Sequence, residues 1–161
     1  MSFGDILIRP ERPDHPQVVA MLAELDAYLA ALYDPEDNHI LDVQALLAPE
    51  IDFLVAEGQG VLVGCGATRR MPGEPDTADQ RYGEIKRMFV HPAARGQRIA
   101  QRLLGQLEER LKGDGVSLAL LETGRDQLEA VRLYERSGYV PRGAFGGYPD
   151  NGLSLFYEKR L

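Results

Sequence analysis

The chain has 161 residues, of which 44% are hydrophobic, as expected for a globular protein with a core of its own. Its net charge of −7 argues against a general nucleic-acid-binding role, because no basic excess is available to neutralise phosphates, but is compatible with a cationic small molecule. The single cysteine, Cys65, and three histidines far apart in the sequence predict neither a disulfide framework nor a metal site.

The first half of the chain alternates between strand and helix patterns. Its N-terminal segment, MSFGDILIRP, lacks the layout of a signal peptide, and no apolar run is long enough to span a membrane. We therefore expect a cytoplasmic protein with no membrane partner. In chain order we expect a strand at residues 5–10, a helix from Pro16 that ends before Pro35, a short helix at 43–47, and strands at 52–57 and 60–71.

The second half predicts a strand–helix–strand unit from Tyr82 to Thr123, with a right-handed crossover. The elements expected here are a strand at 82–92, a helix from Ala94 with Ile99, Leu103, Leu107 and Leu111 on one face, a strand at 116–123, a helix at 127–138, and strands at 139–143 and 153–161. The fold class is α/β (α+β), a mixed and mostly antiparallel sheet of about seven strands flanked by helices on both faces. We expect a single domain over residues 1–161.

The turn HPAARGQRIAQRLL, residues 91–104, places arginines and Gly96 at a strand-to-helix junction. A helix N-terminus carries unpaired amides and a partial positive charge, and glycine lets a ligand approach the backbone. The amides of Gln97, Arg98 and Ile99, with the charge of Arg95 and Arg98, would suit a phosphate or pyrophosphate. From the residues alone, exposed arginines that increase solubility are an equal alternative.

The segment MFVHPAARGQRIA resembles the acetyl-CoA-binding motif of the GNAT superfamily of N-acetyltransferases. In that family a hydrophobic-Val-His/Asn-Pro run is followed by [Q/R]-x-x-G-x-[G/A]. Arg95 takes the first motif position, Ile99 the fifth and Ala100 the last. Arg98 replaces the usual glycine. The backbone would still bind pyrophosphate if the dihedrals at Arg98 were helical, which arginine tolerates; alternatively, the bulk of Arg98 changes the affinity for the cofactor.

A second motif, QLEAVRLYERSGY at residues 127–139, resembles the family pattern N-x-x-A-x-x-x-Y-x-x-x-G-F. Ala130, Tyr134 and Gly138 match, while Gln127 replaces Asn and Tyr139 replaces Phe. The likeness covers nearly the whole chain and extends to a subgroup of small uncharacterised bacterial members. It implies an acetyl-CoA co-substrate, a primary amine of a small molecule or peptide as acceptor, no metal, and room for a homodimer, since family members often dimerise.

The family fold implies a V-shaped splay between residues 83–90 and residues 116–123. The pantetheine arm of CoA would pair with the first strand, and an amide of that strand would stabilise the oxyanion. By alternation, Glu84, Lys86, Met88 and Val90 should project to one side of the sheet and Arg87 and Phe89 to the other. The cofactor-binding residues implied are Met88, Phe89, Val90, Arg95, Gly96, Gln97, Arg98, Ile99, Ala100, Gln127 and Tyr134.

The resemblance assigns Tyr134 as the general acid toward the CoA thiolate; the alternative is a packed tyrosine with a structural hydroxyl. Glu84 is the candidate base. A water relay in its place, or a role in binding an ammonium or fixing an arginine, remains open.

Acceptor binding is expected near Arg87, Arg125 and Tyr148, with residues 143–152 as a mobile loop or an ordinary hairpin with aromatic anchors. Cys65, with no histidine nearby in the sequence, is a poor nucleophile, which favours direct transfer in a ternary complex. A non-catalytic acyl-CoA-binding or sensing module is the alternative function, and a kinase is disfavoured because no metal-binding acidic motif accompanies the turn.

Overall fold

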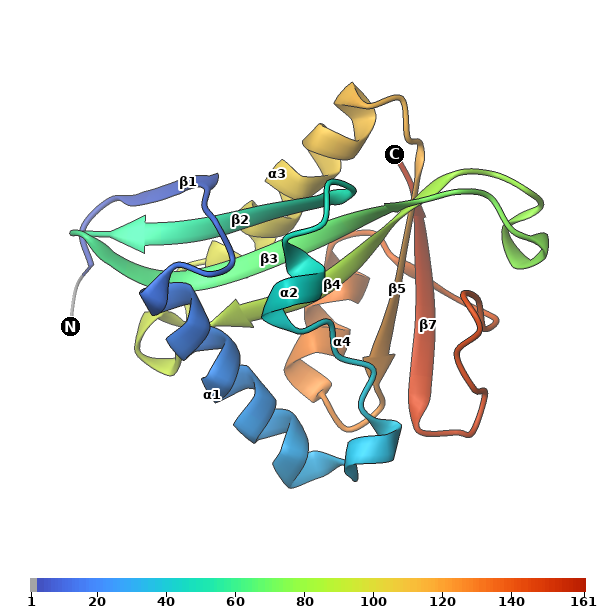
Figure 1. Ribbon diagram of the computed structural model, residues 1–161, viewed down its shortest axis with the longest axis horizontal. Coiled ribbons are helices and arrows are strands. Elements are labelled where there is room, and N and C mark those ends of the chain that lie inside the picture. The colour runs from blue at the N-terminus through green and yellow to red at the C-terminus, as the bar shows by residue number, and fades with distance from the viewer. Residues whose placement is uncertain (1–2) are drawn as a thin grey trace.

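The computed structural model describes residues 3–161 and is a mixed sheet with helices packed on both faces (Figure 1). No helix within these residues has both the length and the apolar character needed to cross a membrane. The elements are β1 (Ile6–Pro10), α1 (Pro16–Leu32), α2 (Val43–Leu46), β2 (Ile51–Gly58), β3 (Val61–Met71), β4 (Tyr82–Val90), α3 (Ile99–Gly113), β5 (Leu118–Gly124), α4 (Leu128–Arg136), β6 (Val140–Arg142) and β7 (Ser154–Arg160).

The sheet has seven strands within the described residues, in the order β1-β2-β3-β4-β5-β7-β6. Every neighbouring pair is antiparallel except β4 and β5, which are parallel and joined through α3. Helices α1 and α2 lie on one face of the sheet, and α3 and α4 lie on the other (Figure 1). The predicted fold class is confirmed.

Helix α3 is held by the apolar face that its periodicity predicts. Ile99, Leu103, Leu107 and Leu111 are each at most 2% exposed and pack against the sheet. On the opposite face, α1 covers a separate core with side chains from β2, β3 and β4. These two layers fix the central strands from both sides.

Strands β4 and β5 part soon after they meet. Their pairing is limited to Gly83 with Ala119 and Glu84 with Leu120, although both strands continue for several residues. The edge of β4 that faces β5 therefore carries backbone groups beyond Glu84 that the sheet does not pair, and such groups need other partners. The expected splay between these strands is present.

A β-bulge at Arg87 changes which side chains share a face of β4. Gly66 of β3 stands opposite two residues, Arg87 and Met88, and Arg87 has a φ of 57°. Met88 fits because its sulfur occupies the space where a Cβ on Gly66 would lie. Arg87 and Phe89 thus face α1, whereas Met88 faces α3.

The prediction that strict alternation puts Met88 and Val90 on the side of Glu84 and Lys86 was therefore wrong. Val90 packs in the α3 core with Met88, while Lys86 reaches the opposite side and bonds to the backbone of His39. The extra residue of the bulge reverses the side-chain directions after it.

The start of α3 also differs from the sequence-based expectation. A short 3-10 turn (Pro92–Ala94) follows β4, and the α-helix begins at Ile99 rather than near Ala94. Arg98 precedes the helix with φ 59° and ψ 25°, so its dihedrals are left-handed and not the right-handed helical ones that arginine tolerates. This left-handed conformation favours glycine, which explains why the motif usually carries glycine at this position.

A buried polar cluster ties α3 to the C-terminal half of the sheet. The Tyr139 hydroxyl donates to Glu108 at 2.8 Å, and the Lys159 ammonium donates to the other oxygen of the same carboxylate at 3.0 Å. Glu108 is 8% exposed, so these bonds replace the water that its charge has lost. The hydroxyl of Tyr139 thus has a structural role that the phenylalanine of the family motif lacks.

Replacing Tyr139 with phenylalanine should lower the free energy of unfolding by about 1.5–3 kcal/mol, because a buried carboxylate loses a charge-assisted hydrogen bond. Urea unfolding followed by circular dichroism measures the change. The control is Tyr157→Phe, whose hydroxyl lies 3.4 Å from Glu135, and which should cost under about 0.5 kcal/mol. Equal losses in the two variants would contradict the assigned role of the cluster.

Candidate active site

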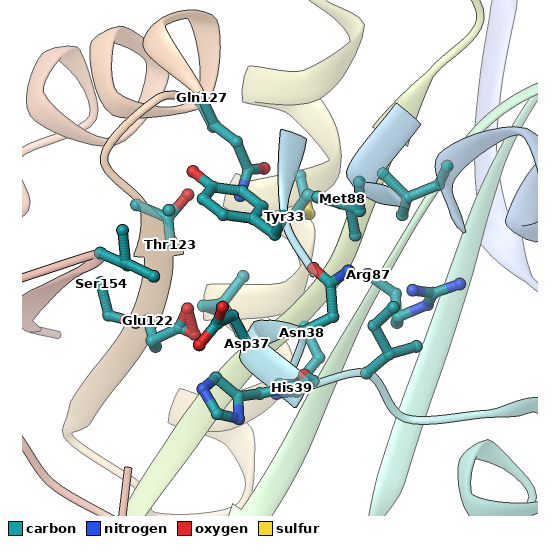
Figure 2. Close-up of a pocket in the computed structure, with 18 of the residues that line it drawn as sticks. Tyr33, Asp37, Asn38, His39, Arg87, Met88, Glu122, Thr123, Gln127 and Ser154 are labelled. Atoms are coloured by element: carbon teal, nitrogen blue, oxygen red, sulfur yellow. Dashed lines mark hydrogen bonds between the residues drawn. The ribbon is translucent and has the colours of Figure 1, made fainter. Parts of the chain in front are cut away.

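The splay between β4 and β5 opens into a pocket of about 110 Å³ (Figure 2). Its walls come from α1 and the segment after it, from both splayed strands, from the start of α4 and from the start of β7. The apolar part of the lining includes Leu25, Leu29, Ile85 and Met88. The polar part consists of Tyr33, Asp37, Asn38, His39, Lys86, Arg87, Glu122, Thr123, Gln127, Tyr134 and Ser154.

Glu122 is the acidic side chain that the core sheet brings into this pocket. It lies on β5, two residues beyond the last residue that pairs with β4, and is largely buried. Burial raises the pKa of Glu122 to about 7, against the opposing effect of the Lys86 charge and with a smaller contribution from Glu84. This carboxyl group therefore exchanges a proton near neutral pH.

Tyr134 reaches the pocket from α4 and is 6% exposed. Burial, and after it the negative charge of Glu122, raises the pKa of Tyr134 well above its usual value. The phenol therefore keeps its proton at neutral pH. The pocket brings this residue, which the sequence analysis expects to be catalytic, together with Met88 and Gln127, two of the expected cofactor contacts.

Glu84 lies at the point where β4 and β5 still pair, and it is 3% exposed. The Tyr148 hydroxyl donates a hydrogen bond to it, and the Lys86 ammonium lies 3.7 Å from the same carboxylate oxygen. Lys86 also donates to the Tyr148 hydroxyl at 2.7 Å and to the His39 carbonyl at 3.1 Å. Glu84 is thus enclosed by these partners and is not one of the residues found to line the pocket.

The three residues expected on the acceptor side have different surroundings. Arg87 lines the pocket (Figure 2). Its guanidinium turns to α1 and donates to Asp26 at 2.6 Å and to the Leu22 carbonyl at 3.3 Å. Arg125 is exposed and lies outside the lining. Tyr148 anchors residues 143–152 to β4, so of the two readings of that segment the contacts fit the hairpin with aromatic anchors.

The turn before α3 presents backbone amides without protein partners. The structure gives no hydrogen-bond acceptor, among the residues it describes, to the amides of Gly96, Gln97 and Arg98. The first amides of α3 follow them and have no intrahelical acceptor either. A Cβ added to Gly96, whose φ is 85°, would meet nothing within 4 Å. The turn is therefore open to a ligand and carries the partial positive charge of the helix N-terminus.

Arg95 connects this turn to its surroundings. Its side chain donates to the Val90 carbonyl at 3.2 Å and lies 3.4 Å from Glu129 at the start of α4. The two helix N-termini thus lie on either side of the opening between β4 and β5.

Cys65 cannot act as a nucleophile in this arrangement. It is fully buried, and burial raises the pKa of its thiol to about 12. Its sulfur donates to the Arg87 carbonyl at 3.4 Å within the sheet. The thiolate needed for an acyl-enzyme is therefore not formed at neutral pH.

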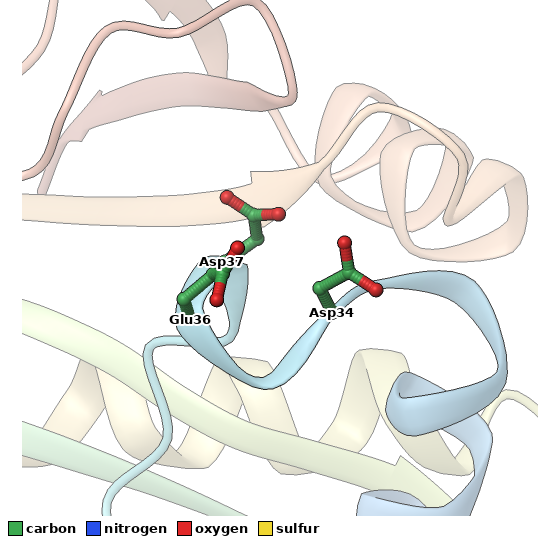
Figure 3. Close-up of side chains that lie close together, drawn as sticks. All are labelled: Asp34, Glu36 and Asp37. Atoms are coloured by element: carbon green, nitrogen blue, oxygen red, sulfur yellow. The ribbon is translucent and has the colours of Figure 1, made fainter.

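An acidic group lies beside the pocket, after α1. The carboxylates of Asp34, Glu36 and Asp37 have oxygens within 4.8 Å of one another (Figure 3). Asp34 and Glu36 are exposed, whereas Asp37 also lines the pocket. We assign this group no ion, since exposed carboxylates often gather without one; its charge adds to the negative potential at the pocket mouth.

Sequence reasoning missed Glu122, and a signal for it was available. In the strand LALLET, which is otherwise apolar apart from Thr123, this is the one charged residue. A lone charge within a buried strand is costly unless it has a role. His39 and Asp37 offered no such signal, because they lie in an irregular segment whose path only the packing of the chain defines.

Comparison with known proteins gives a consistent result. The sequence profile of the acetyltransferase (GNAT) family matches residues 18–139. The protein named IAA acetyltransferase of Azospirillum brasilense is 46% identical over 157 residues, which cover 98% of this chain and 99% of the relative.

Two solved structures are similar over almost their full length. One is described as an acyl-CoA N-acyltransferase from Klebsiella pneumoniae, with 34% identity, a TM-score of 0.77 and 97% coverage of both chains. The PaiA N-acetyltransferase of Thermoplasma acidophilum, solved with coenzyme A, has 19% identity and a TM-score of 0.75, and the match covers 98% of this chain and 99% of that one.

Because the backbone at Arg98 is left-handed, we expect a glycine at this position to stabilise the fold. Arg98→Gly should raise the free energy of unfolding by about 0.5–1 kcal/mol, because glycine adopts this conformation without the steric cost paid by arginine. Arg95 has a φ of −68°, so Arg95→Gly should instead lower the free energy of unfolding by about 0.5–1 kcal/mol through the entropy of the unfolded chain. Thermal unfolding of both variants tests the contrast, and a loss in Arg98→Gly would contradict it.

Proposed function

Because the chain belongs to the acetyltransferase (GNAT) family, we propose that it moves an acetyl group from acetyl-CoA to a primary amine of a small molecule or peptide. The transfer is direct, within a ternary complex. The observation that carries the proposal is the set of unpaired amides at Gly96, Gln97 and Arg98, beside the open edge of β4.

The unpaired amides indicate where coenzyme A binds. The diphosphate of CoA is bound by the turn before α3, where Arg95 and Arg98 add positive charge and Ile99 and Ala100 begin the helix. The pantetheine arm pairs with the open edge of β4 along Met88 and Val90, as an added strand would. The complex of the Thermoplasma relative with coenzyme A supports this choice of co-substrate.

The chemistry of transfer needs an oxyanion donor and a proton for the leaving thiolate. The amide of Met88 or Phe89, beside the bulge in β4, is our candidate for the oxyanion donor. Tyr134 supplies the proton to the thiolate, since its raised pKa keeps it protonated before the reaction. The buried thiol of Cys65 supports direct transfer over an acetyl-enzyme route.

The non-catalytic alternative, an acyl-CoA-binding or sensing module, drew its support from Arg98 in place of the motif glycine. That support is weak, because Arg98 adopts the left-handed backbone that the glycine would adopt. A binding module would also have no need for a protonated tyrosine beside the thioester.

Gly96→Ala should weaken coenzyme A binding by at least tenfold, because a left-handed φ and an added methyl group disturb the amides that face the diphosphate. The matched control is Gly115→Ala, which has a φ of 75° and open space around it, at the other end of α3. Calorimetric titration with coenzyme A measures both variants. Similar affinities in the two would place the diphosphate elsewhere.

Tyr134→Phe should lower kcat by roughly 100-fold or more and leave the dissociation constant for coenzyme A within about threefold, because it removes a general acid and keeps the ring. Thiol release from acetyl-CoA is measured with ethanolamine, benzylamine, putrescine and a peptide with a free N-terminus. Tyr28→Phe, on the exposed side of α1, is the control. Binding of acetyl-CoA by the wild-type chain without any amine-dependent thiol release would favour the sensing module.

A further inference from the structure

We propose that Glu122, rather than Glu84, is the catalytic carboxylate that takes the proton from the acceptor ammonium. This inference rests on the proposed acetyl transfer, and it identifies the acceptor as an amine that enters the pocket with its positive charge.

The two carboxylates differ in their position along β4 and β5, and this decides which of them an acceptor can reach. Glu84 lies at the last paired position of β4, opposite Leu120, where the strands leave no space between them. Glu122 lies two residues beyond Leu120, in the part of β5 that has moved away from β4 and lines the pocket. An incoming amine can therefore reach Glu122 from the pocket.

The hydrogen-bond and charge partners of the two carboxylates also favour Glu122 as the base. Glu84 accepts a hydrogen bond from Tyr148 and has Lys86 at 3.7 Å, so its charge is already compensated. Lys86 is in turn occupied by Glu84, Tyr148 and the His39 carbonyl. Glu84 thus acts as a positioning residue that connects β4 to two acceptor-side loops.

The groups that face Glu122 come from every element around it. Lys86 and Glu84 approach from β4, the Ser154 hydroxyl from β7, Tyr134 from α4 and Tyr148 from the segment before β7, while Asp37 and His39 line the same pocket from the segment after α1. Burial raises the pKa of Glu122 to about 7; of its neighbours, Lys86 and Ser154 lower this pKa and Glu84 raises it. A base is most effective when its pKa lies near the working pH, so Glu122 suits proton transfer at neutral pH.

His39 is the main competitor for this role. Its Nε2 atom is buried and has no hydrogen-bond partner among the described residues. Burial, followed by the charge of Lys86, lowers the pKa of His39 below its ordinary value, which makes it a weaker proton acceptor than Glu122 at neutral pH. Its neutral ring can receive a hydrogen bond from the acceptor instead.

Glu122 and Tyr134 together account for every proton that moves in the reaction. The ammonium gives one proton to Glu122, and the free nitrogen lone pair forms the C–N bond at the thioester carbonyl. When the C–S bond breaks, its electron pair leaves on sulfur, and Tyr134 donates a proton to the thiolate. The second proton lost by nitrogen returns to the tyrosine oxygen, and Glu122 releases the first to solvent.

The test is the pH profile of kcat/KM for the fastest amine of the panel, with acetyl-CoA saturating. In the wild type, kcat/KM should rise up to pH about 7 and then stay level until the amine itself titrates, since Glu122 must be ionised. Glu122→Gln should lose roughly 100-fold at pH 7, and its rate should rise about tenfold per pH unit without a break near 7, because only free amine reacts.

Two further variants should shift, in opposite directions, the pH at which kcat/KM stops rising, here called the break. Ser154→Ala removes a hydroxyl that lowers the pKa of Glu122, so the break should shift to higher pH. Glu84→Gln removes a negative charge that raises the pKa of Glu122, so the break should shift to lower pH. These shifts keep the inference testable even if Glu122→Gln does not fold, and His39→Gln should leave the break in place.

Three results would overturn the assignment. The first is a wild-type profile without a break near pH 7, and the second is a break that persists in Glu122→Gln. The third is loss of the break in Glu84→Gln or His39→Gln. Calorimetry with coenzyme A on each variant distinguishes this failure from failure of the proposed function. In the latter case the wild type itself binds no coenzyme A or releases no thiol when the amine is added.

Discussion

The parting of β4 and β5 is the constraint on which the rest of the structure depends. A parallel pair in the middle of a sheet normally bonds along its whole length, yet here the bonding stops at Glu84 and Leu120. Backbone groups that lose a sheet partner must find another, or their burial costs free energy. The strands part between two separate cores, one on each face of the sheet, so the open edge belongs to the folded chain itself.

Two local irregularities adapt this opening to a ligand. The bulge at Arg87 turns that side chain to α1 and Met88 to α3. Before α3, Arg98 has a left-handed backbone, and the amides of Gly96, Gln97 and Arg98 have no acceptor among the described residues. Around the opening, the contacts among Glu84, Lys86 and Tyr148 connect β4 to the segments that border the acceptor side. The pocket is thus bounded by rigid strands and by loops with defined anchors.

The helices and strands could be predicted from the sequence because their hydrophobic residues recur at regular spacing. Leu103 and its helical neighbours identify the face of α3, and the apolar strand after it identifies the buried centre of the sheet. The bulge at Arg87 was missed because alternation contains no sign of an extra residue opposite Gly66. The left-handed conformation of Arg98 was not foreseen because few residues other than glycine adopt it. Glu122 was missed although it is an isolated charge in an apolar strand, and its place in the pocket follows from the parting of β4 and β5 beside it.

The carboxylates at the pocket also bear on how the acetylated product leaves. In the proposed reaction the acceptor would arrive as a cation, attracted by Glu122 and by the acidic group of Asp34, Glu36 and Asp37. The proposed transfer would convert its nitrogen into a neutral amide, which those charges would no longer attract. The electrostatic attraction for the substrate would therefore end with the reaction, which favours release of the product.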